Sequence, residues 1–350
     1  MISASVDLPV RPPRNFQAAH STVINTHLIS RALDRKMIFD DVAKEKFREL
    51  LAKQCAFSQV ELVTFCLMGN HFHLLVRIDT AEPNPLHDAP DKALLDHLEL
   101  IYSADEVQKI GWQLESFRAG GFEKPAAELR QKYLDRMRDI PSFMQELKQR
   151  FSRWHNRRVR RKGTVWEDRY KSVQVEDSET AVRTMAAYID LNPVRAGMVE
   201  DPKDYRWSGY GEAVAGGNSA RAGLSRLVRT ETGDDTSTAT WAQIQAIYRC
   251  WLYDEGKVVL DDDGKVIRRG FAAETAEMVI NRQQGAIARP VLVKIRLRHF
   301  SEGVAIGSKA FIESVFESRR ELFSARRIDG ARKIQDVRWG GLMAMRDLRG

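Results

Sequence analysis

Two histidines in one segment and a tyrosine in another are the residues of this chain best suited to chemistry. His71 and His73 lie at i and i+2 in an apolar run. Alternate side chains of a strand share a face, so both imidazoles should point the same way, about 7 Å apart along the strand. Two such imidazoles can bind one metal ion. A later segment adds Tyr188 as a nucleophile and Asn192 as a possible third ligand. This set fits a metal-assisted enzyme that breaks a phosphodiester bond through a tyrosine.

Each of these residues also has a purely structural interpretation. A His-x-His pair can simply lie on a solvated strand face. Tyr188 and Asn192 are neighbours at i and i+4 on the flank of a helix whose apolar stripe includes Met185 and Ile189. Tyr188 could then be a boundary tyrosine with its hydroxyl in water, and Asn192, which precedes a proline, could cap a new helix. The hairpin placement of the histidines and the later Tyr–Asn pair favour the chemical interpretation.

The predicted metal site has two imidazoles and one amide oxygen, with positions left for phosphate oxygens. Mg²⁺ prefers oxygen ligands, whereas Mn²⁺ tolerates imidazole better. We therefore expect a divalent cofactor, Mg²⁺ or Mn²⁺, that neutralises charge developing on phosphorus. A tyrosine phenol has a pKa of about 10, so it needs a base or an activated phosphate, and no base is evident in the sequence.

A basic stretch follows between residues 148 and 171, where ten Lys and Arg residues face only Glu167 and Asp168. Closely spaced Lys and Arg side chains can bind the phosphates along a nucleic-acid backbone, and exposed aromatic rings can stack on unpaired bases. A solvated basic face is the alternative, and Phe151 and Trp154 fit a core better. The predicted DNA-contacting residues are Arg150, Arg153, Arg157, Arg158, Arg160, Arg161, Lys162, Trp166, Arg169 and Lys171.

The pattern of elements predicts an α+β fold. In chain order the periodicity indicates strand, helix, strand, strand, helix, strand, helix, which is a ferredoxin-like split βαβ arrangement with an antiparallel sheet and one extra helix. The predicted segments are 21–29, 41–55, 60–68, 71–78, a helix opening near 142, 165–175 and 178–192.

The sequence also predicts how the chain is divided into domains. We expect a flexible arm over 1–18, a catalytic domain over 19–212 with a helical insertion at 79–140, and a small, polar linker over 213–240. Residues 241–350 should form a mostly helical basic domain that binds DNA, since the last sixty residues hold thirteen Lys and Arg against seven Asp and Glu.

Bulk composition narrows the class of protein. A net charge of +7 favours nucleic acid as partner. Three widely spaced cysteines show no disulfide or zinc pattern, which fits the cytoplasm, here in association with the nucleoid. The first residues do not have the pattern of a secretory signal. The sequence contains no run of about 18 apolar residues, so we expect no membrane partner.

Three blocks of the sequence together resemble one family. They are GNHFHLL at 69–75, GTVWEDRYKS at 163–172 and YIDLNPVRAG at 188–197. With these blocks the region 20–210 resembles the Y1 transposases of the IS200/IS605 type, whose HUH motif is His-hydrophobe-His. The REP-associated tyrosine transposases are the most similar branch.

The resemblance implies that His71 and His73 bind the metal, with Asn192 where the family has a polar, often ligating, residue. It implies that Tyr188 attacks single-stranded or hairpin DNA, leaving a 5′-phosphotyrosine and a free 3′-hydroxyl, so that rejoining completes DNA transposition without ATP. Family members include monomers and dimers that swap the tyrosine helix, so either state is expected. The alternatives are a non-catalytic protein that binds DNA or RNA, and a domesticated enzyme that serves its host.

Overall fold

The computed structural model describes residues 22–232, 239–255, 259–260, 266–268, 300, 303–323, 327–333 and 342–346. The arm expected over 1–18 lies outside these residues. A seven-stranded sheet forms the centre of the molecule, with strand order β2-β3-β1-β4-β7-β9-β8. Its strands are β1 (Val23–Arg31), β2 (Glu61–Leu67), β3 (His71–Asp79), β4 (Lys171–Val175), β7 (Gly303–Gly307), β8 (Arg332–Lys333) and β9 (Met343–Arg346).

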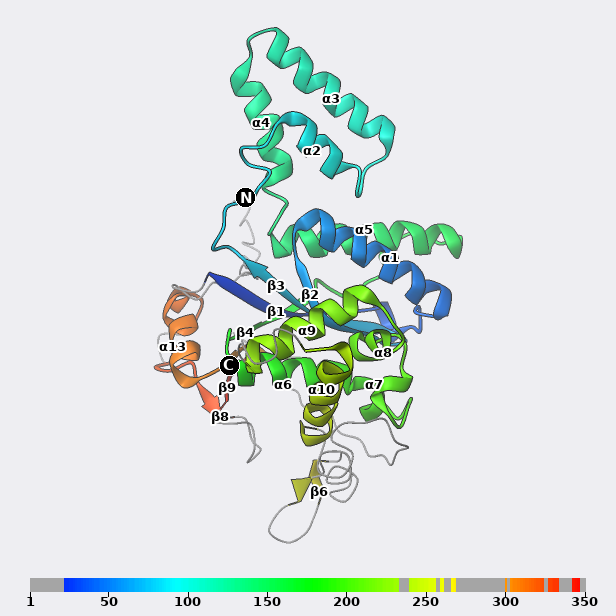
Figure 1. Ribbon diagram of the computed structural model, residues 1–350, viewed down its shortest axis with the longest axis vertical. Helices are drawn as coiled ribbons and strands as arrows, with labels where there is room; N and C mark the ends of the chain where they lie inside the picture. The colour runs from blue at the N-terminus through cyan, green and yellow to red at the C-terminus, as the bar shows by residue number, and fades with distance from the viewer. Residues whose placement is uncertain are drawn as a thin grey trace, which may run out of the picture.

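The first four strands confirm the predicted α+β, ferredoxin-like fold. β1 lies between β3 and β4 and is antiparallel to both, and β2 pairs with β3 through a tight connection at Gly69 and Asn70. Two helices connect these strands and cover one face of the sheet: α1 (Asp41–Ser58) and α5 (Ile140–Arg158). Figure 1 shows them side by side above the strands.

Local sequence explains where these helices begin. The side chain of Asp40 accepts a hydrogen bond from the backbone N–H of Ala43, and Asp139 does the same for Ser142. Both are N-caps that satisfy otherwise unpaired helix donors. Apolar side chains of the sheet, including Phe72 and Leu74, pack against Phe47 and Phe151 of the two helices. This buries the apolar side of β3, which leaves its histidines on the other face.

That other face is covered by α6 (Glu179–Asp190) and α9 (Asn218–Thr232), and α10 (Trp241–Glu255) packs against these two helices, as Figure 1 shows. Shorter helices continue from α6: α7 (Asn192–Arg195), η2 (Pro202–Asp204) and α8 (Gly209–Val214). In α6 the predicted stripe is present, because Met185 and Ile189 are fully buried. The sheet is therefore covered on both faces.

The insertion forms its own small bundle away from the sheet. Its helices are α2 (Asp91–Leu98), α3 (Ala104–Ala119) and α4 (Glu123–Leu134). Their apolar faces form a separate core around Leu94, Leu98 and Leu114, joined by Phe57 from the end of α1. Figure 1 shows this bundle standing beyond α1 and α5.

The linker expected over 213–240 is wrong for the residues that the structure describes there. Residues 218–232 form α9, and its buried residues Leu224 and Val228 belong to the main core. Gly223 allows α9 to approach β2 closely, since a Cβ at this position would lie 2.6 Å from the carbonyl oxygens of Leu62 and Val63. Small residues here permit close packing of the helix on the sheet. From composition alone, the same residues indicate a loop.

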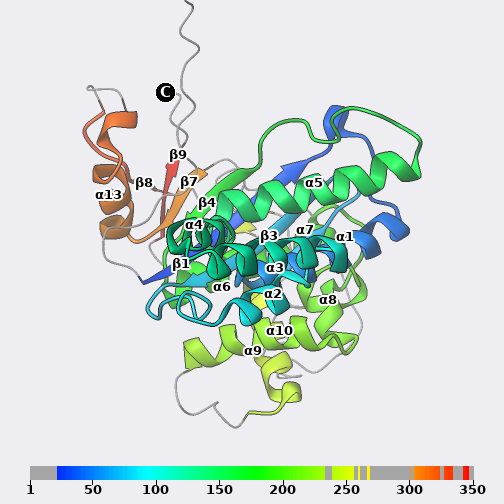
Figure 2. The ribbon, with the colours of Figure 1, turned by 90° about the horizontal axis from the view of Figure 1, so that it is seen from above.

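The prediction that residues 241–350 form a separate, mostly helical domain is also wrong for the part of this region that the structure describes. β7 pairs in parallel with β4 and extends the sheet, and Tyr248 and Leu252 of α10 belong to the main core. The remaining elements are β5 (Val259–Leu260), β6 (Val266–Arg268), α13 (Lys309–Glu317) and η5 (Arg320–Leu322). Figure 2 shows α13 beside β7, β8 and β9 at one edge of the sheet. Strand pairing between distant segments is not visible in local periodicity. Among the described residues, no helix has both the length and the apolar character to cross a membrane.

Candidate active site

Three imidazoles lie close together on the sheet face that α6 covers. In the β1–β3 register His71 is opposite Arg31 and His73 is opposite Ile29, so the side chains of these four residues share a face. His27, two residues before Ile29, shares it too. The ring centroids of His71 and His73 are 5.1 Å apart, and so are those of His73 and His27. The third histidine was not among the predicted site residues.

Tyr188 of α6 reaches this cluster. Its ring meets the rings of His73 and His27 edge to face, with centroids 6.1 Å and 6.0 Å apart. The tyrosine is only 5 % exposed, so it is not the boundary residue that its place on the flank of the helix suggested. The covering helix and the histidines of the sheet bury it together. Within one chain Tyr188 thus lies beside His73, and the ring of His71 is in turn next to that of His73.

Two further side chains contact the tyrosine ring. Phe300 stacks on it, with centroids 4.7 Å apart and an angle of 17° between the planes. The guanidinium of Arg195 lies over the ring at 4.7 Å, and its Nη1 donates a hydrogen bond of 2.6 Å to the carbonyl oxygen of Tyr188. Arg195 is seven residues after Tyr188, about two helical turns, and it adds a positive charge beside the phenol.

Burial keeps two of the imidazoles neutral. Loss of solvent around His27 lowers its pKa to about 3, although its hydrogen bond to the Phe300 carbonyl acts in the opposite direction. For His73 burial is again the largest cause, and positive charge on nearby histidine and arginine side chains lowers the pKa further, well below its usual range. Neutral imidazole is the form that can bind a metal.

The described contacts of Asn192 are at the end of α6. Its Nδ2 donates hydrogen bonds to the carbonyl oxygens of Tyr188 at 3.0 Å and Ile189 at 3.2 Å. It therefore satisfies C-terminal carbonyls of α6 rather than capping the start of the next helix, whose geometric N-cap is Leu191. The ligand role of Asn192 stays a prediction.

The basic stretch begins in the second half of α5 and continues through a loop that passes the end of β1, near His71. Leu33 N–H donates to the carbonyl of Val165, and Glu167 N–H donates to the carbonyl of Arg31, which is paired with His71. Most of its predicted DNA-contacting cations are exposed: Arg153, Arg157, Arg158, Arg160, Lys162, Arg169 and Lys171. The loop thus presents positive charge at the strand end that carries the first histidine.

Some members of the stretch are already engaged within the protein. Arg158 forms a bidentate pair with Asp40, with distances of 2.8 and 2.7 Å. Arg150 is half-buried and donates to the carbonyl of Ile101 in the insertion, and burial lowers its pKa. Arg161 is half-buried as well and donates to the carbonyl of Thr164. These contacts leave the exposed members other than Arg158 as the better candidates for phosphate.

Trp166 does not present its ring to solvent, and the prediction that it contacts DNA is wrong for this structure. It is only 7 % exposed and packs against Phe72 and Phe151, with ring centroids 5.6 and 5.7 Å apart. Its indole N–H donates to the hydroxyl of Ser152 at 2.8 Å. A tryptophan surrounded by aromatic core residues and hydrogen-bonded internally has no face left for a base.

The residues missed from the sequence left weak signals. His27 lies at i+2 from Asn25 and at i−2 from Ile29 in a β-branched run, so these three side chains had to share one face of the strand. Only the strand pairing shows that this face is the histidine face of β3. Phe300 is remote in the sequence and carries no local signal.

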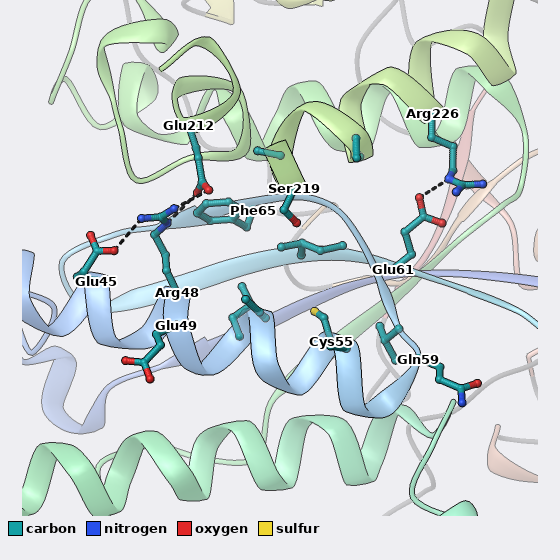
Figure 3. A pocket seen from close by; sticks show the side chains of 18 residues that line it. Glu45, Arg48, Glu49, Cys55, Gln59, Glu61, Phe65, Glu212, Ser219 and Arg226 are labelled. Carbon is teal, nitrogen blue, oxygen red and sulfur yellow. Dashed lines mark hydrogen bonds and ion pairs between the residues drawn. The ribbon is translucent and has the colours of Figure 1, made fainter. Parts of the chain in front are cut away.

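A groove of about 810 Å³ lies elsewhere, between α1, β2 and α9. Figure 3 shows its polar rim, where Arg48 reaches Glu45 and Glu212 while Arg226 pairs with Glu61. None of the predicted site residues lines it, and its cations are paired with carboxylates. It is not the candidate site.

Comparison with known proteins identifies part of the chain. Residues 20–84 match the family described as "Transposase IS200 like". These residues hold β1, α1, β2 and β3, with His27, His71 and His73, and they end before Tyr188. No curated protein matches the chain. One similar solved structure is a REP-associated tyrosine transposase bound to a REP hairpin, with 13 % identity and a TM-score of 0.37, covering 59 % of this chain and 86 % of that one. Residues 20–84, which hold all three clustered histidines, are therefore similar to an IS200-like transposase domain.

Proposed function

We propose that this protein nicks and rejoins single-stranded DNA through Tyr188, as a metal-dependent tyrosine transposase with a 5′-phosphotyrosine intermediate. The observation that carries the proposal is the convergence of Tyr188 with His73, whose ring centroids are 6.1 Å apart on elements far apart in the sequence. A protein that only binds nucleic acid does not need a phenol beside two imidazoles. One protomer holds the tyrosine and both histidines, so the proposal does not need a swapped helix.

The chemistry is a transesterification that balances. The Oη atom of Tyr188 forms a bond to phosphorus, and the bond from phosphorus to the 3′-oxygen breaks. The phenol loses one proton and the leaving 3′-oxygen gains one, which gives a 3′-hydroxyl. Attack by another 3′-hydroxyl reverses the step and releases the tyrosine. Arg195, whose guanidinium lies 4.7 Å from the ring centroid, is suited to bind the negative phosphate near Oη.

The donor set fits a divalent cation. His71 and His73 supply two imidazoles, His73 is held neutral by burial, and Asn192 offers an amide oxygen. Within the described residues no group of three or more His, Cys, Asp or Glu could hold a metal, so substrate phosphate oxygens would have to complete the coordination. Two nitrogen ligands favour Mn²⁺ over Mg²⁺. The bound cation would neutralise charge that develops on the phosphoryl oxygens.

The exposed cations near the end of α5 supply a route for the DNA backbone. Their loop lies beside the strand end that carries His71. A DNA strand whose phosphates bind these exposed cations would reach the histidine cluster. Tyr188 is only 5 % exposed, and Phe300 stacks on its ring, so the phenol lies at the inner end of this route.

The test is covalent capture of DNA with the full chain. Hairpin-containing single strands with random flanks are labelled at the 3′ end, incubated with Mn²⁺ and run on a denaturing protein gel. The wild type should retain the label, because a 5′-phosphotyrosine holds the downstream fragment, whereas DNA labelled only at the 5′ end should give no labelled adduct. Tyr188→Phe should lose the adduct and still bind DNA, because the ring and its stacking on Phe300 remain.

Tyr102→Phe is the matched control, since Tyr102 lies in the insertion and contacts Arg136 there. It should form the adduct as the wild type does. If Tyr188→Phe still captured DNA, another residue would be the nucleophile. If the wild type bound DNA but formed no adduct with any divalent cation, the protein would belong to the class of binding proteins.

A further inference from the structure

The two predicted metal-binding imidazoles are each held through their Nδ1 atom by a different polar chain. Nδ1 of His73 lies 2.9 Å from Nε2 of His27, and Nδ1 of His27 lies 2.8 Å from the carbonyl oxygen of Phe300. Nδ1 of His71 lies 2.6 Å from Oδ1 of Asn70. The partners at the far ends of these chains decide which ring nitrogens carry protons.

The first chain has one consistent proton arrangement for neutral rings. A carbonyl oxygen can only accept, so Nδ1 of His27 must be the protonated nitrogen. Nε2 of His27 is then an acceptor, and Nδ1 of His73 must donate to it. A neutral imidazole carries one proton, so the lone pair of His73 is on Nε2. His73 therefore donates to His27, and His27 donates to the carbonyl oxygen of Phe300.

The second chain reaches the same result through an amide. Nδ2 of Asn70 donates a 3.0 Å hydrogen bond to the carbonyl oxygen of Arg35, which fixes the orientation of the Asn70 side chain. Oδ1 of Asn70 therefore faces His71 as an acceptor, and Nδ1 of His71 donates to it. Asp34 and Arg35 have φ angles of 54° and 56°, and this left-handed turn presents the Arg35 carbonyl to Asn70.

We propose that His27 and Asn70 are positioning residues that hold His71 and His73 as Nδ1–H tautomers, so that both rings present Nε2 to one cation. A metal-binding histidine commonly donates its other ring N–H to such a partner, which orients the ring and raises its basicity. The inference rests on the proposed function, because it assigns the surroundings of the same site. It adds two residues, on two different elements, that the resemblance did not imply.

The tautomers can be measured without metal and without DNA. In ¹⁵N-labelled full-length protein freed of metal, long-range ¹H–¹⁵N correlations distinguish a protonated ring nitrogen from an unprotonated one. His71 and His73 should both show unprotonated Nε2, with the signals assigned by their loss in His71→Ala and His73→Ala. His27→Phe should abolish this pattern for His73 and leave it for His71, and Asn70→Ala should do the reverse. The retained signal in each variant reports that the site is still folded.

Titration calorimetry with Mn²⁺ alone gives the second readout. His27→Phe and Asn70→Ala should each weaken Mn²⁺ binding by about 10- to 100-fold. Asn70→Asp keeps an acceptor for His71 and should restore the affinity. His97→Phe is the matched control. His97 lies in the insertion, away from the candidate site, and its Nε2 also hydrogen-bonds a backbone carbonyl, that of Phe57 in α1. It should bind Mn²⁺ as the wild type does.

Protonated Nε2 in either His71 or His73 of the wild type would overturn the inference. Unchanged Mn²⁺ affinity in both His27→Phe and Asn70→Ala would overturn it as well. Failure of the proposed function looks different, because the tautomers and Mn²⁺ affinities would be as stated while no protein–DNA adduct formed. An adduct formed by a protein with other tautomers would remove only this inference.

Discussion

The phenol ring of Tyr188 meets the imidazole of His73 edge to face, at an angle of 82° between the two planes. The tyrosine comes from a helix and the histidine from a central strand, and the covering of β3 by α6 brings them together. Because both side chains are almost fully buried, their relative position is held by core packing rather than by flexible loops. This relationship is the basis for the predictions about activity.

Removing either predicted metal ligand should change the metal dependence of DNA cleavage. With His71→Ala or His73→Ala one imidazole nitrogen is lost, so we expect slower cleavage and a rise of at least about tenfold in the Mn²⁺ concentration for half-maximal rate. Cleavage of labelled hairpin DNA across a Mn²⁺ series measures both quantities. Rates and half-maximal concentrations equal to those of the wild type in both variants would place the metal elsewhere.

Charge reversal in the basic stretch should reduce the salt dependence of DNA binding. The variant combines Arg157→Glu, Arg160→Glu, Lys162→Glu and Arg169→Glu, all at exposed positions. If each cation contacts one phosphate of a single strand, the slope of log affinity against log salt should fall by up to about 3. Fluorescence anisotropy at several salt concentrations measures the slope. Lys124→Glu on the exposed face of α4 is the control and should leave it unchanged, and an unaltered slope in the fourfold variant would move the DNA path elsewhere.

Two arginine–aspartate pairs of similar geometry should differ in their effect on stability. Arg249 and Asp201 form a bidentate pair with both side chains fully buried, at 2.8 and 2.7 Å. Arg249→Met leaves a buried carboxylate without its main partner and should lower the free energy of unfolding by about 3–5 kcal/mol. Arg158→Met removes the exposed bidentate pair with Asp40 and should lower the free energy of unfolding much less, because solvent screens this pair. Urea unfolding compares them, and equal costs would contradict the burial argument.

Asp190 should make stability fall as the pH rises. Burial raises the pKa of its carboxyl to about 6, although hydrogen bonds from Tyr248, Tyr210 and Thr64 act to lower it. Between about pH 4 and 6 the unfolded state therefore releases a proton that the folded state keeps, which favours unfolding as pH rises. Asp190→Asn lacks this change. The free energy of unfolding of Asp190→Asn relative to wild type should thus increase by roughly 2 kcal/mol from pH 4 to pH 7.

Urea unfolding of both proteins at several pH values tests the sign. His27 has the opposite dependence, since its lowered pKa makes acid unfavourable for the folded state. Both proteins keep His27, so its contribution cancels in the difference. A difference that does not vary with pH would mean that the carboxyl is ionised in the folded protein at pH 4.

Much of the structure around β3 and α6 could be predicted from local pattern. The alternation in β3 placed Phe72 and Leu74 on one face and His71 and His73 on the other, and the structure has this arrangement. The helical period of 178–192 identified the buried stripe of α6. Both follow from periodicities of 2.0 and 3.6 residues, which are properties of the chain itself.

Errors arose where burial depends on a distant partner. Trp166 was predicted to contact DNA because it lies among cations, but the aromatic residues that surround it come from other elements. The small residues before and within α9 were interpreted as a linker, because composition does not reveal a helix packed closely on β2. Strand β7 joins β4 from far along the chain, and no local signal predicts that pairing.

The sequence by itself determined the order of the elements, the face on which the two histidines lie and the presence of a tyrosine helix. Only the tertiary structure decided that Tyr188 lies beside those histidines, that His27 belongs to the same cluster and that Phe300 covers the phenol. The physical reason is that side-chain alternation is set by the geometry of each segment. Contacts between segments depend on strand order, register and helix packing, which involve the whole chain at once.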